Sequence, residues 1–293
     1  MDIFTIKNSK RIIRLSESSL QKQTDRKYPY VQTINGEKKY YAICPHCKNP
    51  VVIVNLYRDN IKDNIKKTVK LHARHVKSSI KDITEYDELS YIACPLSNPE
   101  SFGSSTRRKA GSNMNNEIIN IIKKHPDLLY SMCKSILGIN FNEKLYLEIM
   151  KDFISAKGYE FRYITKYNLP YSFLYMSDNK PITFQKIFKN KIGEELEESI
   201  KNKCENIYVD NKKQIKYKKD KNVKFASLEL YLSNYKRQDT SDELYESIDL
   251  IIKENIDNKK VLIFKKNIII DNYYFTNIIQ QFFRLENQIN SLF

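Results

Sequence analysis

The sequence predicts an α+β fold. Strand-like and helix-like runs both occur, but they do not alternate in the regular βαβ order of a parallel sheet. Asn35-Gly36 separates two strand-like runs and supplies the two positive-φ residues that a two-residue hairpin turn needs. Residues 117–157, by contrast, read as helices. At 293 residues, the chain is long enough for one large domain or two ordinary ones.

Residues 1–28 are basic, with isoleucine and leucine between the charges. This composition fits a basic arm that follows a phosphate backbone. It also fits a strand and a short helix with a charged outer face, and the β-branched residues favour this second interpretation.

The next elements are a hairpin, a cysteine knuckle and a third strand. Residues 30–34 and 37–43 form the predicted hairpin, and residues 51–56 form the strand after the knuckle. Apolar residues then recur every four positions at Ile61, Ile65 and Val69. This spacing predicts a helix over residues 57–71.

The stretch Cys44-Pro45-His46-Cys47 indicates a definite chemistry. The thiolates of a C-x2-C knuckle can bind one tetrahedral ion, and a later His and Cys can complete the site. Cys94-Pro95 forms a second Cys-Pro corner, and His75 precedes it. We therefore predict one structural zinc ion on Cys44, Cys47, His75 and Cys94, with His72 as the alternative to His75. Four protein ligands leave no open position for catalysis.

The hairpin, knuckle and strand within residues 30–95 resemble zinc-ribbon or treble-clef modules. The resemblance is architectural and points to no named family. We therefore predict that residues 1–100 form a zinc-binding basic module, and that a mixed helix and antiparallel-strand domain follows it.

Two other chemistries compete with zinc. Cys-Pro-His-Cys resembles the active-site tetrapeptide of thioredoxin-fold disulfide oxidases, but Pro50 and the β-branched residues after it oppose the helix that such a site needs. Asp25, Glu37 and Lys39 have a loose spacing of the kind seen in metal-dependent nucleases. No Gly-rich phosphate loop, HExxH or GxSxG sequence is present, so we lean against an enzyme.

Residues 101–116 read as a flexible basic linker. They lack apolar periodicity, contain Gly103 and Gly111, and carry the cluster Arg107-Arg108-Lys109. We therefore predict an α+β domain over residues 117–293.

Within this domain, three helices over residues 117–157 and a hairpin of strands 159–166 and 171–176 resemble a winged helix. The elements expected after it are a helix over 184–204, a hairpin over 206–218, a strand over 225–232, a helix beginning near 239–242, a strand over 260–270 and a helix over 272–291.

The charge favours a nucleic-acid partner. The formal net charge is +15, and two thirds of the excess lies in residues 1–112. Lys and Arg neutralise phosphates and release counterions, so we expect binding to DNA or RNA mainly through phosphates. The candidate contacts are Arg11, Arg14, Lys39, Lys48, Arg107, Arg108 and Lys109, with Tyr40 and Tyr41 as stacking surfaces. The alternatives are a protein-interaction or inhibitor module of a defence or phage type, and a metal-dependent nuclease.

The cysteines and the apolar runs point to the cytoplasm. The chain has five cysteines, an odd number that argues for reduced thiols rather than a disulfide framework. No run approaches the ~20 apolar residues needed to span a bilayer, and no signal peptide is recognisable.

Overall fold

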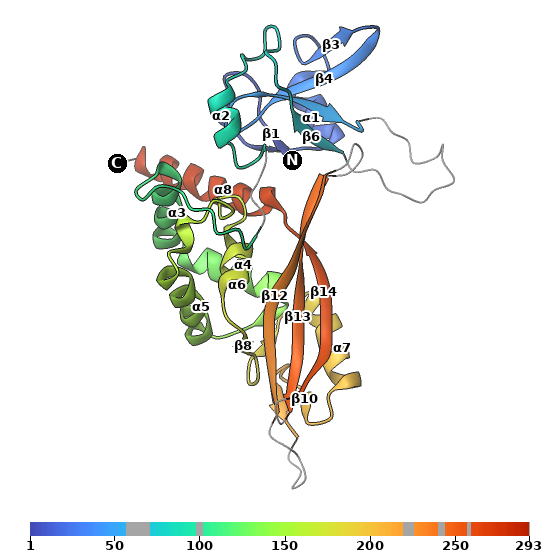
Figure 1. Cartoon of the computed structure of the whole chain (residues 1–293), viewed down its shortest axis with the longest axis vertical. Helices are drawn as coiled ribbons and strands as arrows, with labels where there is room; N and C mark the ends of the chain where they lie inside the picture. The colour runs from blue at the N-terminus through green and yellow to red at the C-terminus, as the bar shows by residue number, and fades with distance from the viewer. Residues whose placement is uncertain (57–70, 98–101, 219–225, 240–243, 257–258, 293) are drawn as a thin grey trace, which may run out of the picture. The chain divides into compact units, whose positions relative to one another are not determined.

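The computed structural model describes residues 1–56, 71–97, 102–218, 226–239, 244–256 and 259–292 (Figure 1). Helices and antiparallel sheets are both present, which confirms the α+β class. The chain divides into two compact units. Unit 1 comprises Met1–Ser101, Arg237–Glu246 and Asp271–Phe293, and unit 2 comprises Phe102–Lys236 and Ser247–Ile270. The division into residues 1–100, 101–116 and 117–293 stays a prediction.

Unit 1 is built on a four-stranded sheet in the order β3-β4-β5-β6, with every neighbouring pair antiparallel. The strands are β3 (Val31–Ile34), β4 (Glu37–Ile43), β5 (Pro50–Val54) and β6 (His72–His75). The unit also contains β1 (Ile3–Phe4), β2 (Ile13–Arg14), α1 (Glu17–Thr24), α2 (Glu88–Ala93) and α8 (Asn272–Asn290).

The predicted hairpin of unit 1 is confirmed. Asn35 and Gly36 both have positive φ, 53° and 80°, and they join β3 to β4. Successive strand residues point to opposite faces. Tyr41 accordingly packs in one apolar cluster and Ala42 in another, so the sheet is covered on both faces.

The basic N-terminal segment forms the predicted strand-and-helix arrangement. Ser16 and Ser19 make a capping box at the start of α1, and Leu20 is buried. The backbone of Met1 exchanges two hydrogen bonds of 2.8 Å with Ala73 of β6. This pairing covers the outer edge of β6.

The three predicted helices of unit 2 are confirmed. They are α3 (Asn113–Lys124), α4 (Pro126–Leu137) and α5 (Glu143–Ser155). Pro126 opens α4 in its first turn, Gly138 ends it in the left-handed region, and Asn142 caps α5. The unit continues with η1 (Gly158–Glu160), α6 (Leu169–Met176) and α7 (Lys191–Lys203).

The strands of unit 2 form one larger sheet and two small ones. The larger sheet has the order β14-β13-β12-β8. Its strands are β8 (Lys180–Pro181), β12 (Ala226–Asp239), β13 (Leu244–Ile256) and β14 (Lys259–Ile269). The end of β12 and the start of β13 fall within Arg237–Glu246 and so belong to unit 1. Pairs are also formed by β7 (Ile139–Asn140) with β9 (Lys186–Ile187), and by β10 (Ile207–Val209) with β11 (Ile215–Tyr217). The last pair confirms the predicted hairpin over 206–218.

The predicted hairpin over 159–166 and 171–176 is wrong, because residues 171–176 lie in α6. Pro170 stands in the first turn of this helix, where a proline is tolerated. Residues 169–174 are all buried, so no polar stripe marks the helix in the sequence. Since 158–160 form η1 and 169–176 form α6, the three helices have no wing after them, and the resemblance to a winged helix fails.

The helix predicted to begin near 239–242 is also wrong. Strand β12 reaches Asp239, and β13 begins at Leu244, while residues 240–243 lie outside the described part of the chain. Acidic residues are favoured in the first turn of a helix, and their presence here led to the helix prediction. Residues 247–256 of β13 pair with β14 in antiparallel register, so this segment is a strand.

One further helix prediction lies outside the described residues, and another changes. The helix over 57–71 falls almost wholly on residues 57–70, which lie outside the described part, and His72–His75 form strand β6 rather than a helix end. The helix over 184–204 begins only at Lys191, because Asn190 accepts a hydrogen bond from the amide of Gly193 as an N-cap.

A polar ladder crosses the larger sheet at Asp249, a carboxylate that is only 2% exposed. It accepts hydrogen bonds from Asn234 of β12 (3.2 Å) and Asn267 of β14 (2.9 Å), and it pairs with Lys265 of β14 (3.0 Å). Burial raises the pKa of Asp249, but these three donors outweigh it, so the pKa lies below its ordinary value.

We expect Asp249→Asn to destabilise the protein by about 1–2 kcal/mol near neutral pH, because a hydrogen-bonded charge is lost. A lowered folded-state pKa adds stability above the unfolded pKa of about 3.9, and this stability disappears as the pH falls through the folded value. The difference between wild type and variant should therefore shrink below about pH 4. Urea unfolding from pH 7 to pH 3 measures it, and a difference independent of pH would contradict the assignment.

We also expect Gly138→Ala to destabilise the protein more than Gly111→Ala. Both residues have positive φ, +67° and +75°, which costs a non-glycine residue about 1–2 kcal/mol. A Cβ at Gly138 would lie 2.6 Å from the backbone nitrogen of Gly193, whereas one at Gly111 has no heavy atom within 4 Å. Urea denaturation of both variants separates the two effects, and equal losses would contradict the close approach.

Candidate metal centre

Four side chains that are far apart in the sequence meet in unit 1: Cys44, Cys47, His75 and Cys94. Their potential ligand atoms all lie within 4.8 Å of one another. The Cys44 and Cys94 sulfurs are 3.7 Å apart, and the Cys47 sulfur is 3.3 Å from Nε2 of His75. This arrangement is compatible with one metal ion.

The first two cysteines lie in the tight loop between β4 and β5. The amide of Cys44 donates to the carbonyl of Asn49 (2.9 Å), and the amide of Lys48 donates to the carbonyl of Cys44 (3.1 Å). Lys48 takes a positive φ of 62°, which turns the chain back toward β5. The loop thereby directs both sulfurs to one place.

The histidine of the cluster is His75, at the end of β6. His72 and His75 are three residues apart on a strand, so their side chains point to opposite faces. His75 directs Nε2 toward Cys47 and, at 3.8 Å, toward Cys94. The ring of Tyr91 packs edge-on against it, with centroids 5.6 Å apart. The sequence left His72 and His75 as alternatives, and the geometry selects His75.

Cys94 is the C-cap residue of α2, and both ends of this helix are tied to the cysteine loop. The buried amide of Asn49 accepts a hydrogen bond from the Asp87 nitrogen (2.7 Å) and donates to the Asp87 carbonyl (3.0 Å). Asp87 in turn caps α2 through the nitrogen of Ser90 (2.7 Å). Asn49 holds one end of the helix, and Cys94 places the other end at the cluster.

The pKa values of the three thiols shift in different directions. Burial, followed by contact with the other two sulfurs, raises the pKa of Cys44 well above its ordinary value. Hydrogen bonds from Cys44 and Cys94 lower the pKa of Cys47. The hydrogen bond from Cys44 lowers the pKa of Cys94, but contact with Cys47 and burial raise it to about 12. Burial and contact between the sulfurs thus oppose ionisation of Cys44 and Cys94, whereas their hydrogen bonds favour ionisation of Cys47.

This donor set fits a metal with a preference for sulfur and nitrogen ligands. A divalent ion would stabilise three thiolates together, and three sulfurs with one imidazole fill a tetrahedral shell. Among the described residues, this is the one group of three or more His, Cys, Asp or Glu side chains with suitable spacing. Cys133 and Cys204 are buried and stand apart from it.

Among the described residues, neither the disulfide-oxidase site nor the nuclease site has the geometry that its chemistry needs. Cys47 is followed by Lys48, Asn49 and strand β5, so the cysteines do not lie at the helix N-terminus that a thioredoxin-type site requires. Asp25 ends α1 as an exposed C-cap and pairs with Lys27, while Glu37 and Lys39 lie on β4. Within the described residues, no metal-binding group includes Asp25 or Glu37.

The phosphate-contact candidates of unit 1 differ in exposure and pairing. Arg11 and Lys48 are exposed, and Lys48 also donates to the carbonyl of Pro45 (3.0 Å). Arg14 pairs with Asp271 (3.1 Å), although 57% of its side chain is exposed. Lys39 is half-buried.

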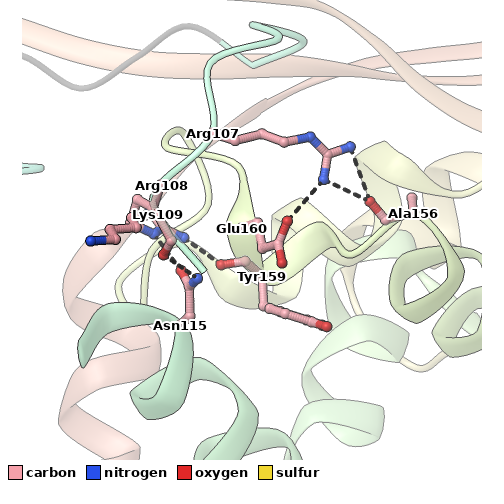
Figure 2. A network of polar contacts seen from close by, with 7 residues as sticks. All are labelled: Arg107, Arg108, Lys109, Asn115, Ala156, Tyr159 and Glu160. Atoms are coloured by element: carbon pink, nitrogen blue, oxygen red, sulfur yellow. Dashed lines mark hydrogen bonds and ion pairs between the residues drawn. The ribbon is translucent and has the colours of Figure 1, made fainter. Parts of the chain in front are cut away.

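The cluster at 107–109 is engaged within unit 2 (Figure 2). The Arg107 guanidinium donates to the Ala156 carbonyl (3.3 Å) and pairs with Glu160 (3.4 Å). Arg108 donates to Asn115 (2.8 Å) and to the carbonyl of Tyr159 (2.7 Å), and burial lowers its pKa to about 10. These two arginines join segments of unit 2.

The remaining contact candidates are Lys109, Tyr40 and Tyr41. Figure 2 shows the Lys109 ammonium directed away from the bonds made by Arg107 and Arg108, and Lys109 is exposed. The prediction that Tyr41 stacks on a base is wrong, because Tyr41 is 3% exposed and packs in the core. Tyr40 is half-buried.

Sequence reasoning missed Asn49 and Tyr91, which position the cluster without belonging to it. Asn49 follows Cys47 by two residues and precedes Pro50, so its place in the knuckle was visible, but its bond partner Asp87 is far away in sequence. Tyr91 stands three residues before Cys94, as expected for a residue one helical turn away.

No protein-family model, curated protein or solved structure matches this chain. In the described part of the chain, no helix is both long and apolar enough to cross a membrane.

We expect the purified protein to contain one transition-metal ion per chain, and Cys44→Ser to lose it. Removing one of four ligands weakens binding strongly, because metal affinity and local folding are coupled. Cys204→Ser is the matched control, since Cys204 is equally buried in unit 2 but lies outside the cluster. Elemental analysis gives the stoichiometry. Metal-free protein with freely titratable thiols, or equal loss in both variants, would contradict the site.

Proposed function

We propose that Cys44, Cys47, His75 and Cys94 hold one structural zinc ion. The convergence of three sulfurs and one imidazole nitrogen within 4.8 Å carries this proposal. Zinc suits a tetrahedral set of sulfur and nitrogen donors, and four protein ligands leave no position open for a substrate. The ion would join the loop between β4 and β5 to β6 and α2.

The proposed zinc module is similar in outline to a zinc ribbon. A knuckle between two antiparallel strands supplies two ligands. The other two come from the end of strand β6 and the end of helix α2, rather than from a second knuckle between strands. The module therefore combines strand and helix ligands, as a treble-clef arrangement also does.

We further propose that the protein binds nucleic acid, mainly through phosphates. The net charge of +15 supports this function, because excess Lys and Arg favour a polyanionic partner. The exposed side chains of Arg11, Lys48 and Lys109 are the strongest contact candidates. Arg14 and Lys39 are weaker candidates for phosphate contacts, because Arg14 pairs with Asp271 and Lys39 is half-buried. Arg107 and Arg108 already bond within unit 2, so in this proposal they hold its segments together.

We expect the affinity for a 20-base-pair duplex to fall as salt rises from 50 to 200 mM, with a log–log slope of about −0.9 per phosphate neutralised. Arg11→Gln/Lys48→Gln should weaken binding and reduce the magnitude of the slope by about 2, since two cation contacts are lost. Fluorescence anisotropy with a labelled duplex and a labelled single strand measures both quantities and compares the two forms.

Lys144→Gln/Lys151→Gln on α5 is the charge-matched control, because both lysines are exposed in unit 2. An affinity that does not depend on salt would refute phosphate binding. Equal losses in the two double variants would mean that only the net charge matters, which contradicts the assignment to Arg11 and Lys48.

A further inference from the structure

Helix α2 turns its apolar residues outward. Leu89 is 80% exposed and Ile92 is 60% exposed, and no residue of the helix is buried. Residues three apart share one face of a helix, so the two side chains lie together. Tyr91 lies on another face, where it contacts His75. A short helix in a soluble protein ordinarily buries its apolar face, and this one presents it.

The helix is held firmly in this orientation. Asn49 bonds both backbone groups of Asp87 at its start, and Cys94 lies in the candidate metal centre at its end. The hydroxyl of Ser97 also donates to the carbonyl of Tyr91 (2.7 Å). Such preorganisation lowers the entropy that a binding partner has to overcome.

The segment that contains this helix has a charge opposite to that of the whole chain. Residues 82–93 contain four acidic residues and no Lys or Arg, although the chain carries +15. Glu85, Asp87 and Glu88, which closely precede Leu89 in the sequence, are exposed. Lys77 lies over the Tyr91 ring, with Nζ 5.3 Å from the centroid, and therefore lies toward a different face of the helix from Leu89.

We propose that α2 is a docking surface for a basic amphipathic segment of another protein. Leu89 and Ile92 would pack against apolar side chains of that segment, and Glu85 and Glu88 would pair with its Lys or Arg residues. Charge complementarity selects this partner, because an acidic face repels the phosphates of a nucleic acid. The inference is independent of the nucleic-acid proposal, and it uses the proposed zinc ion only to hold Cys94.

A random peptide library displayed on phage, selected on the full-length metal-containing protein, tests the proposal. The selected peptides should be enriched in Lys or Arg, with apolar residues three or four positions apart. Synthetic copies should bind Leu89→Ser/Ile92→Ser at least about tenfold more weakly than wild type, as expected for central apolar anchors. Glu85→Gln/Glu88→Gln should weaken binding and reduce its dependence on salt.

Leu147→Ser/Ile154→Ser on α5 is the matched control, because these residues are 57% and 53% exposed in unit 2. It should bind the peptides as wild type does. Metal content and circular dichroism, measured on the same samples, separate the loss of a surface from the loss of the zinc module.

Three results would overturn the proposal. The phage selection yields no binding peptide, the selected peptides are not enriched in Lys or Arg, or the peptides bind wild type and Leu89→Ser/Ile92→Ser equally well. Duplex binding abolished by the same variant would instead assign the face to nucleic acid. Self-association in sedimentation that the variant removes would assign it to a second copy of the chain.

Discussion

Unit 1 depends on one electrostatic constraint: three sulfur atoms meet in a largely buried place where they cannot all ionise unaided. Burial and contact between the sulfurs raise the pKa of Cys44 and Cys94, while hydrogen bonds from these two residues lower the pKa of Cys47. A cation removes this competition, because it attracts every thiolate at once. The same charges that oppose one another in the free cluster would then stabilise the bound state.

This constraint also explains the architecture around the cluster. The sheet of unit 1 is small. The four candidate metal ligands come from a loop, a strand end and a helix end. Helix α2 buries no side chain of its own, so apolar packing contributes little to its position. Asn49 and Cys94 provide that position instead. Because the helix does not depend on core packing, Leu89 and Ile92 on its outer face are exposed to solvent.

The arginine cluster shows why charge in a sequence does not translate directly into a binding surface. Arg107 and Arg108 stand in a glycine-containing stretch that reads as a solvated linker. In the structure, their guanidinium groups bond to carbonyl and carboxylate oxygens from residues 156–162. Arginine has five donors and a planar group, so it readily satisfies several backbone carbonyls at once.

The sequence by itself determined the local features of this protein. Asn35-Gly36 specified a hairpin because both residues accept positive φ, and the Cys-x2-Cys spacing specified a knuckle. Pro126, Gly138 and Asn142 marked helix ends for similarly local reasons. Each of these signals acts within a few residues, so the neighbouring sequence is sufficient to read it.

Only the tertiary structure decided the features that depend on distant partners. Residues 171–176 were predicted as a strand but lie in the largely buried helix α6. A helix was predicted to begin near 239–242, but residues 247–256 pair with β14 as a strand. The choice of His75 over His72 followed from strand β6, whose side chains alternate between two faces. A ligand set is a property of distances in space, and the sequence records only separation along the chain.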